Sequence, residues 1–368
     1  MHYILDLECD NLLDKVTKIH CIVMKDINTN EIFNDIDICL KKIKDAKLLI
    51  GHILIAFDIP VLKKVLNVDI DCEVYDTLVA CRLIYAHIRE IDFKMMHSGF
   101  PKNLISSQSL KAWGYRLKMH KGEKPVDWAV YTPEMLKYCE QDVHVTHTLY
   151  NKLMTKEYSE ESLKLEHDVQ KICTQMMLNG IEFDTAKAKE LYSKLSAERE
   201  TLAKQLHEFF PPWIEESTFI PKRDNKKMGY IAGMPFIKKK KIQFNPNSRD
   251  HIAFRLKEIR NWKPKEFTPD GKPKVDDEIL KQLDYPEAKI LSRYFMIQKR
   301  IAQIAEGNNA WLKLEKNNRI YGSINTNGAI TGRATHSNPN LAQVPAIILE
   351  FGPECRSLFK AADGYVLV

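Results

Sequence analysis

Two acidic residues near the start of the chain, Asp6 and Glu8, are separated by one leucine in an otherwise apolar segment. Residues 3–7 have the composition of a buried strand. Side chains alternate along a strand, so both carboxylates point to the same face. Two like charges side by side on a buried strand repel each other, and a divalent cation is the simplest way to stabilise them. For this pair alone, an edge strand with a solvated acidic face is the favoured alternative.

Two further carboxylates extend the set of candidate metal ligands. Asp58 follows Phe57 and could by itself be a helix N-cap. Asp142 comes four residues after Tyr138, within a segment of helical periodicity at residues 133–153. That spacing puts the phenol and the carboxylate on one face of a helix. Each feature alone is common by chance, but their order and spacing together point to a single site.

The combination resembles the DEDD family of 3′→5′ exonucleases, in the subgroup whose third motif carries a tyrosine. The resemblance implies that the four acids bind two Mg²⁺ ions, with Mn²⁺ as an alternative. Carboxylates suit Mg²⁺, which prefers hard oxygen ligands. We expect Asp6, Glu8 and Asp142 to hold the ion on the side of the nucleophile. Asp6 and Asp58 would hold the other ion, and Tyr138 would orient the attacking water.

The second motif departs from that family. The family carries an asparagine several residues before the aspartate, within a histidine–asparagine–glycine stretch. Here residues 51–58 read GHILIAFD, and Ile53 stands at the asparagine position. In the family this asparagine holds the substrate rather than the metals. We therefore expect exonuclease chemistry with reduced activity or altered substrate handling.

The elements around these residues predict an α/β domain, because strand-like and helix-like segments alternate. Strands are predicted at residues 3–7 and 19–25, another apolar run lies at 47–51, and helices are predicted at 61–66, 77–87 and 133–153. Residues 161–177 and 185–209, separated by Asn179-Gly180, then predict a long helical hairpin that ends at Pro211-Pro212.

The rest of the chain reads as mostly helical. A turn is predicted at residues 268–271 and a helix at 290–305. Residues 222–241 are basic, and the four lysines at 238–241, taken alone, are best explained as solvated surface. The tail is rich in loops and ends in a strand-like run at 365–368.

Several of these later segments resemble family A DNA polymerases of the short-tailed (T7-like) phage type. The most specific is 331–345, which contains T-G-R and P-N-L-x-x-x-P; others lie at 109–117, 245–250, 268–278, 294–300 and 355–359. The resemblance covers the whole chain. It implies a ribonuclease H-like exonuclease domain at 1–155, a helical linker and thumb at 156–305 with a short basic segment at 213–244, and the start of a polymerase palm at 306–368. The residues expected to contact DNA are Thr331, Arg333, Lys299, Arg300, Asn340, Gln343 and Arg356.

In this family the polymerase acids and the fingers helix follow the point at which this sequence stops. We therefore expect no polymerisation by the chain alone. Either a second chain supplies the fingers and most of the palm, or the sequence is truncated, and an exposed apolar strand at 365–368 favours a partner. Some relatives carry a long thumb insertion that recruits host thioredoxin. Residues 213–244 are much shorter, so thioredoxin recruitment is doubtful, and their lysines could instead contact duplex phosphates.

Composition is compatible with these expectations. The net charge of +6 suits a polyanionic partner without requiring one. The N-terminus is not a signal peptide, and no apolar run is long enough for a membrane span. The eight cysteines include no C-x-x-C pair and are expected to be free thiols in the cytoplasm, that of a host cell if the protein is viral.

Three hypotheses follow. The first is a proofreading exonuclease that also forms the template–primer-binding portion of a replicative polymerase and acts on single-stranded DNA 3′ ends. The second is a non-catalytic template–primer-binding subunit of a split polymerase, which gains weight from Ile53. The third, a free-standing DNA or RNA trimming nuclease, is disfavoured because such an enzyme does not need the thumb and T-G-R segments.

Overall fold

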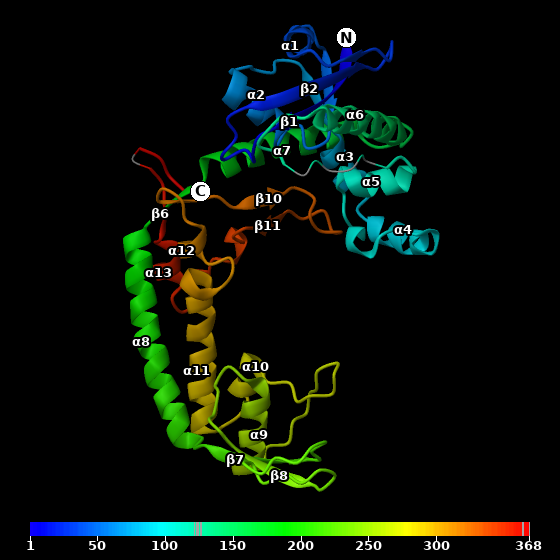
Figure 1. Cartoon of the computed structure of the whole chain (residues 1–368). Helices are drawn as coiled ribbons and strands as arrows, with labels where there is room; N and C mark the ends of the chain where they lie inside the picture. The colour runs from blue at the N-terminus through cyan, green and yellow to red at the C-terminus, as the bar shows by residue number, and fades with distance from the viewer. Residues whose placement is uncertain (121, 123–124, 126, 363, 368) are drawn as a thin grey trace. The chain divides into compact units, whose positions relative to one another are not determined.

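The computed structural model describes residues 1–120, 122, 125, 127–362 and 364–367. The chain forms two compact units. The first contains Met1–Gly180 and Tyr321–Ala342, and the second contains Ile181–Ile320 and Gln343–Val368. Figure 1 shows the elements of both units. None of the described helices is both long and apolar enough to cross a membrane. All eight cysteines are free, as expected.

A five-stranded mixed sheet forms the centre of the first unit, in the order β3-β2-β1-β4-β5. The pairs β1–β2 and β2–β3 are antiparallel, whereas β1–β4 and β4–β5 are parallel. The two strands predicted at residues 3–7 and 19–25 are confirmed, and the apolar run at 47–51 also forms a strand. The strands are β1 (His2–Cys9), β2 (Ile19–Asp26), β3 (Ile32–Phe33), β4 (Leu48–Gly51) and β5 (Glu73–Asp76).

Helices cover both faces of this sheet. On one face, Leu5 and Leu7 of β1 pack in a core with Val61 of α2. On the other face, Ile4 packs with Val143 of α6 (Figure 1). The mixture of helices and strands confirms the predicted α/β class. The helices of this unit are α1 (Ile36–Lys44), α2 (Asp58–Leu66), α3 (Thr77–Ile84), α4 (Ile88–Met95), α5 (Leu110–Leu117), α6 (Pro133–Met154) and α7 (Glu160–Asn179).

The second unit is built around two long helices that run side by side, α8 (Thr185–Phe209) and α11 (Pro286–Ile301) (Figure 1). Leu206 of α8 and Leu291 of α11 belong to one buried core. A small sheet in the order β12-β6-β9 completes the unit, with β6 (Ile181–Phe183), β9 (Arg319–Ile320) and β12 (Phe359–Lys360). The remaining helices are α9 (Arg249–Arg260), α10 (Asp277–Lys281), α12 (Trp311–Leu314) and α13 (Gly352–Arg356).

The predicted helical hairpin is wrong, although the extents of its two helices are nearly right. Strand β6 follows α7 directly, α7 and α8 belong to different units, and α8 packs against α11. Strand β6 pairs with β9 and β12, which come more than a hundred residues later in the chain. Pairing at such a distance leaves no local pattern, so the sequence does not predict this short strand.

A β-hairpin was also missed within the segment expected to be mostly helical. Strands β7 (Trp213–Phe219) and β8 (Phe236–Ile242) pair antiparallel. The lysine run lies on β8 and is exposed, as expected for solvated surface. Opposite it on β7 lie acids, and Lys239 forms a 2.8 Å ion pair with Glu216. Opposite charges across the ladder explain how a lysine run can form a strand.

The strand predicted at the end of the tail is also wrong. Residues 365–367 form no strand and are exposed, and Val368 lies outside the described residues. Apolar residues with strand propensity form a strand only where another strand pairs with them.

Candidate active site

The structure brings all five residues of the predicted site to one cavity of about 310 Å³. Asp6 and Glu8 come from β1, Asp58 from the start of α2, and Tyr138 and Asp142 from α6. These residues span more than 130 positions of the sequence, so their convergence depends on the fold.

Strand β1 and helix α6 explain the convergence. Ile4, Asp6 and Glu8 alternate with buried Leu5 and Leu7 and so share one face of the strand. Ile4 on that face packs against α6, so the carboxylates also point toward this helix. On α6, Tyr138 and Asp142 are one turn apart.

Asp58 is the first residue of α2 and is only 4% exposed. It is not an N-cap, because Phe57 occupies that position and its side chain makes no capping bond. Burial raises the pKa of Asp58 well above its ordinary value, and the nearby Asp6 and Asp76 carboxylates raise this pKa further. A buried carboxyl beside other acids is costly to ionise unless a cation compensates the charge.

The donor set fits a hard divalent cation. Ligand atoms of Asp6, Glu8 and Cys139 lie within 4.8 Å of one another, so this group could hold a metal ion. Burial raises the pKa of Cys139 well above its ordinary value, which favours the neutral thiol. A neutral thiol is a poor ligand, whereas carboxylate oxygens suit hard cations. The carboxylates are therefore the expected ligands of the cation.

A buried acid that the sequence analysis missed, Asp76, holds the loop of the second motif. Its carboxylate accepts hydrogen bonds from the backbone N–H groups of Ile53 (3.1 Å), Ile55 (3.0 Å) and Leu78 (2.9 Å). Burial raises the pKa of Asp76, and these three hydrogen bonds oppose that rise. The sequence signal was weak: an aspartate before a helix is usually read only as an N-cap.

His52 is a second residue that the sequence analysis passed over. Its Nδ1 lies 2.9 Å from the hydroxyl of Thr77, and that hydroxyl donates to the carbonyl of Gly51. Because the hydroxyl proton is used in this way, His52 Nδ1–H is the donor to Thr77. The histidine ring, which lines the carboxylate cavity, is therefore fixed in orientation.

Ile53 also lines this cavity and has a left-handed backbone, with φ of 74°. A β-branched residue is strained in this region, whereas asparagine tolerates it. We expect Ile53→Asn to raise the free energy of unfolding by about 1 kcal/mol, measured by urea denaturation. Ile91→Asn is the control, because Ile91 is equally exposed but lies in helix α4. Equal changes in the two variants would contradict strain at Ile53.

The predicted DNA-binding residues are divided between the two units. Thr331 and Arg333 are exposed in the loop between β10 (Ser323–Asn325) and β11 (Thr335–Ser337). These two residues and Asn340 belong to the first unit. Gly332 lies between Thr331 and Arg333 with φ of 74°, a conformation that favours glycine.

The other four lie in the second unit. Lys299 and Arg300 line a cavity of about 690 Å³. Arg300 donates a hydrogen bond to the side-chain carbonyl of Gln303 at 3.2 Å. The side-chain amide of Gln303 in turn donates to the backbone carbonyl of Gln343 at 2.7 Å. Arg356 instead donates from Nε to the Pro345 carbonyl at 2.9 Å.

Comparisons with known proteins identify relatives of this chain. The family model described as DNA polymerase family A matches residues 232–368. The DNA-directed DNA polymerase of Enterobacteria phage T3 is 33% identical over 454 aligned positions, which cover 97% of this chain and 64% of the relative. That of Escherichia phage T7 is 32% identical with the same coverage. DNA polymerase I of Aquifex aeolicus (strain VF5) is 25% identical over 89% of this chain and 50% of the relative.

The chain thus spans 64% of the length of each phage relative. The alignments to them have more positions than this chain has residues, 454 against 368, so the relatives carry segments that it lacks. Similarity to the two phage polymerases nevertheless extends over almost all of this chain. The chain therefore belongs to the family A DNA polymerases.

Proposed function

We propose that residues 1–155 form a 3′→5′ exonuclease domain that removes nucleotides from a DNA 3′ end and serves proofreading. The observation that carries this proposal is the convergence of four carboxylates and a phenol on one cavity. The mixed sheet in the order β3-β2-β1-β4-β5, with α6 packed on one face, supports a ribonuclease H-like fold for this domain.

The carboxylates divide into two sets of metal ligands. Asp6, Glu8 and Asp142 would hold one Mg²⁺ ion, and Asp6 with Asp58 would hold a second, with Mn²⁺ as an alternative. Metal ions bound there would lower the pKa of the attacking water and offset charge on the attacking and leaving oxygens.

The remaining residues of the cavity position the reactants. The Tyr138 hydroxyl orients the water toward the scissile phosphorus. The ring of Trp128 meets the Tyr138 ring edge to face at 6.1 Å and restricts its orientation. Lys111, exposed at the same cavity, supplies a positive charge for the phosphate backbone.

The remainder of the chain serves template–primer binding in this proposal. Residues 156–305 form the linker and thumb, and residues 306–368 form the start of the palm. The basic segment at 213–244 places lysines on an exposed β-hairpin, which suits salt-dependent contacts with duplex phosphates. The substrates are a single-stranded 3′ end and a template–primer duplex, in the cytoplasm of a host cell.

The test compares 5′-labelled single-stranded DNA, single-stranded RNA and a template–primer carrying a 3′ mismatch, each with Mg²⁺. We expect stepwise shortening of the single-stranded DNA and removal of the mismatched nucleotide, with RNA cut much more slowly. Equal cutting of DNA and RNA would favour a general trimming nuclease instead.

A non-catalytic template–primer-binding subunit is the second candidate, and Ile53 favours it. Ile53 lines the cavity and is 39% exposed, and its side chain can donate no hydrogen bond to a substrate. Such a subunit would bind template–primer and release no nucleotides.

A further inference from the structure

Strand β2 carries one extra residue beside the carboxylate pair of β1. The register passes from Glu8 opposite Cys21 to Cys9 opposite Ile19, so His20 has no partner on β1 and forms a β-bulge. A bulge changes the direction in which a side chain points, and bulges recur at the edges of active sites. The contacts of the His20 side chain therefore show what this bulge provides.

The bulge gives Ile19 and His20 different surroundings. Ile22 packs in the core that contains Leu5, and strict alternation along β2 would place His20, two residues earlier, in the same core. Ile19 packs in that core instead. The buried His20 ring contacts the segment before α6, where its centroid lies 6.5 Å from that of the Tyr131 ring.

A hydrogen bond joins His20 to the same segment. His20 Nε2–H donates to the backbone carbonyl of Trp128 at 2.9 Å, since a carbonyl can only accept. His20 Nδ1 is buried and has no hydrogen-bond partner among the residues that the structure describes. A buried polar atom without a partner costs stability, so packing alone does not explain a histidine at this position.

This hydrogen bond fixes a segment that has little regular structure. The described residues between α5 and α6 form neither helix nor strand, and Trp128 lies among them. Trp128 lines the carboxylate cavity, and its ring meets the Tyr138 ring edge to face at 6.1 Å. A chain of contacts thus runs from β2, through His20 and Trp128, to the phenol of the candidate active site.

We propose that His20 is a positioning residue for the exonuclease reaction: it holds Trp128, and the Trp128 ring in turn holds the Tyr138 phenol where it orients the attacking water. This inference rests on the proposed exonuclease function. His20 is not among the described residues that line the cavity. Its effect on the rate must therefore pass through Tyr138.

The kinetic test is a double-mutant cycle on a 5′-labelled single-stranded oligonucleotide with Mg²⁺. His20→Leu removes the donor and should lower kcat about tenfold, with KM within about twofold of wild type. In the Tyr138→Phe background, which already lacks the hydroxyl, the same change should cost less than about twofold. His20→Gln, whose amide can still donate to Trp128, should recover most of kcat. An equal loss in both backgrounds would overturn the proposal.

The matched control is His207→Leu. His207 donates from Nε2 to the backbone carbonyl of Phe244 at 3.1 Å, the same kind of hydrogen bond, but it lies on α8 in the second unit. Its kcat should remain within about twofold of wild type. Equal losses in His207→Leu and His20→Leu would show a general effect of removing such a bond and would also overturn the proposal.

Fluorine NMR of the full chain labelled with fluorinated tryptophan tests the contact without hydrolysis. The sequence has five tryptophans, and the resonance lost in Trp128→Phe identifies the Trp128 signal. Without metal or DNA, His20→Leu should shift or broaden this signal, whereas His20→Gln and His207→Leu should leave it near its wild-type position. An unchanged Trp128 signal in His20→Leu would overturn the proposal.

The two readouts separate the two possible failures. If wild type hydrolyses nothing but its Trp128 signal depends on His20, the exonuclease proposal fails and the hold on Trp128 is upheld. If wild type hydrolyses DNA and His20→Leu changes neither kcat nor the Trp128 signal, the exonuclease stands and the positioning role of His20 is overturned.

Discussion

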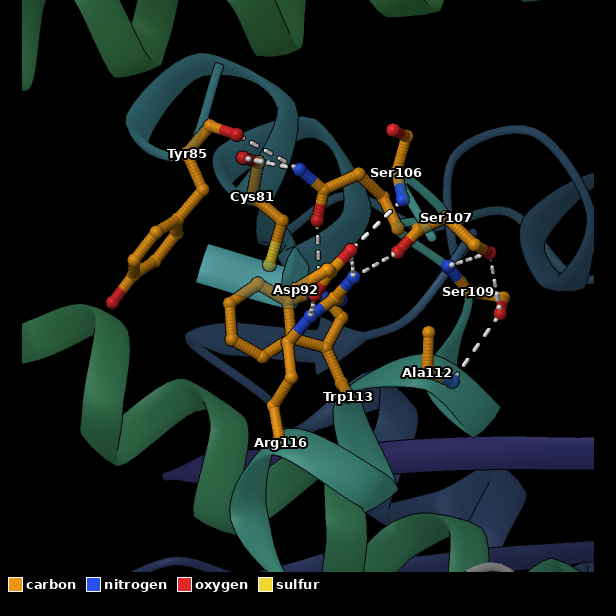
Figure 2. Close-up of polar contacts among 10 residues, drawn as sticks. Cys81, Tyr85, Asp92, Ser106, Ser107, Ser109, Ala112, Trp113 and Arg116 are labelled. Carbon is orange, nitrogen blue, oxygen red and sulfur yellow. Dashed lines mark hydrogen bonds and ion pairs between the residues drawn. The ribbon is translucent and has the colours of Figure 1, made fainter. Parts of the chain in front are cut away.

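Replacing Arg116 with methionine is expected to lower the free energy of unfolding by about 3–5 kcal/mol. Arg116 and Asp92 form a buried bidentate ion pair, with Nε–Oδ1 at 2.9 Å and Nη2–Oδ2 at 3.0 Å (Figure 2). Their side chains are 3% and 0% exposed. Methionine fills similar space but leaves the Asp92 charge buried without its cation. Urea denaturation followed by circular dichroism measures the effect.

Two controls separate this cause from a general loss of packing. The double variant Asp92→Leu/Arg116→Met removes both charges and should recover much of the loss. Lys63→Met breaks an exposed pair with Asp69 at 2.7 Å and should cost less than about 1 kcal/mol. A double variant no more stable than Arg116→Met would show that the uncompensated charge is not the cause.

The second large effect is expected in catalysis. Asp142→Asn should lower kcat for single-stranded DNA by about a thousandfold, because a neutral amide replaces a carboxylate ligand at the reacting centre. Tyr138→Phe removes only the hydroxyl that orients the water and should cost about a hundredfold. Single-turnover release of nucleotides from a labelled oligonucleotide measures both.

Glu140→Gln is the matched control for these variants. Glu140 lies on the same helix and accepts a hydrogen bond from Asn34 at 3.2 Å, but it does not line the cavity. Its activity should remain within a few-fold of wild type. Full activity of Asp142→Asn, or an equal loss in Glu140→Gln, would contradict the assigned roles.

The sequence predicts the parts of the site in which functional side chains recur at the spacing of a strand or a helix. Alternation along β1 predicts that Asp6 and Glu8 share a face, and the structure places them so. The i, i+4 spacing on α6 does the same for Tyr138 and Asp142. The spacing along the chain does not predict that Asp58 joins these residues. That prediction came from the resemblance to a known family.

Other features depend on contacts between distant segments. Asp76 looks like an ordinary cap in the sequence, yet in the fold it holds the loop that carries Ile53. Strand β6 has only three residues and finds partners near the end of the chain. The β7–β8 hairpin is not predicted because the acids that pair with its lysine run lie 23 to 25 residues earlier, Glu216 opposite Lys239 and Glu215 opposite Lys240. Local propensity carries none of this information.

The most direct test of the proposed exonuclease is degradation of a 5′-labelled single-stranded oligonucleotide with Mg²⁺, comparing wild type with Asp6→Ala/Glu8→Ala. We predict a ladder of products shortened one nucleotide at a time from the 3′ end, and its disappearance in the variant. A folded wild-type protein that binds template–primer but yields no ladder would contradict the exonuclease and leave a DNA-binding subunit as the function.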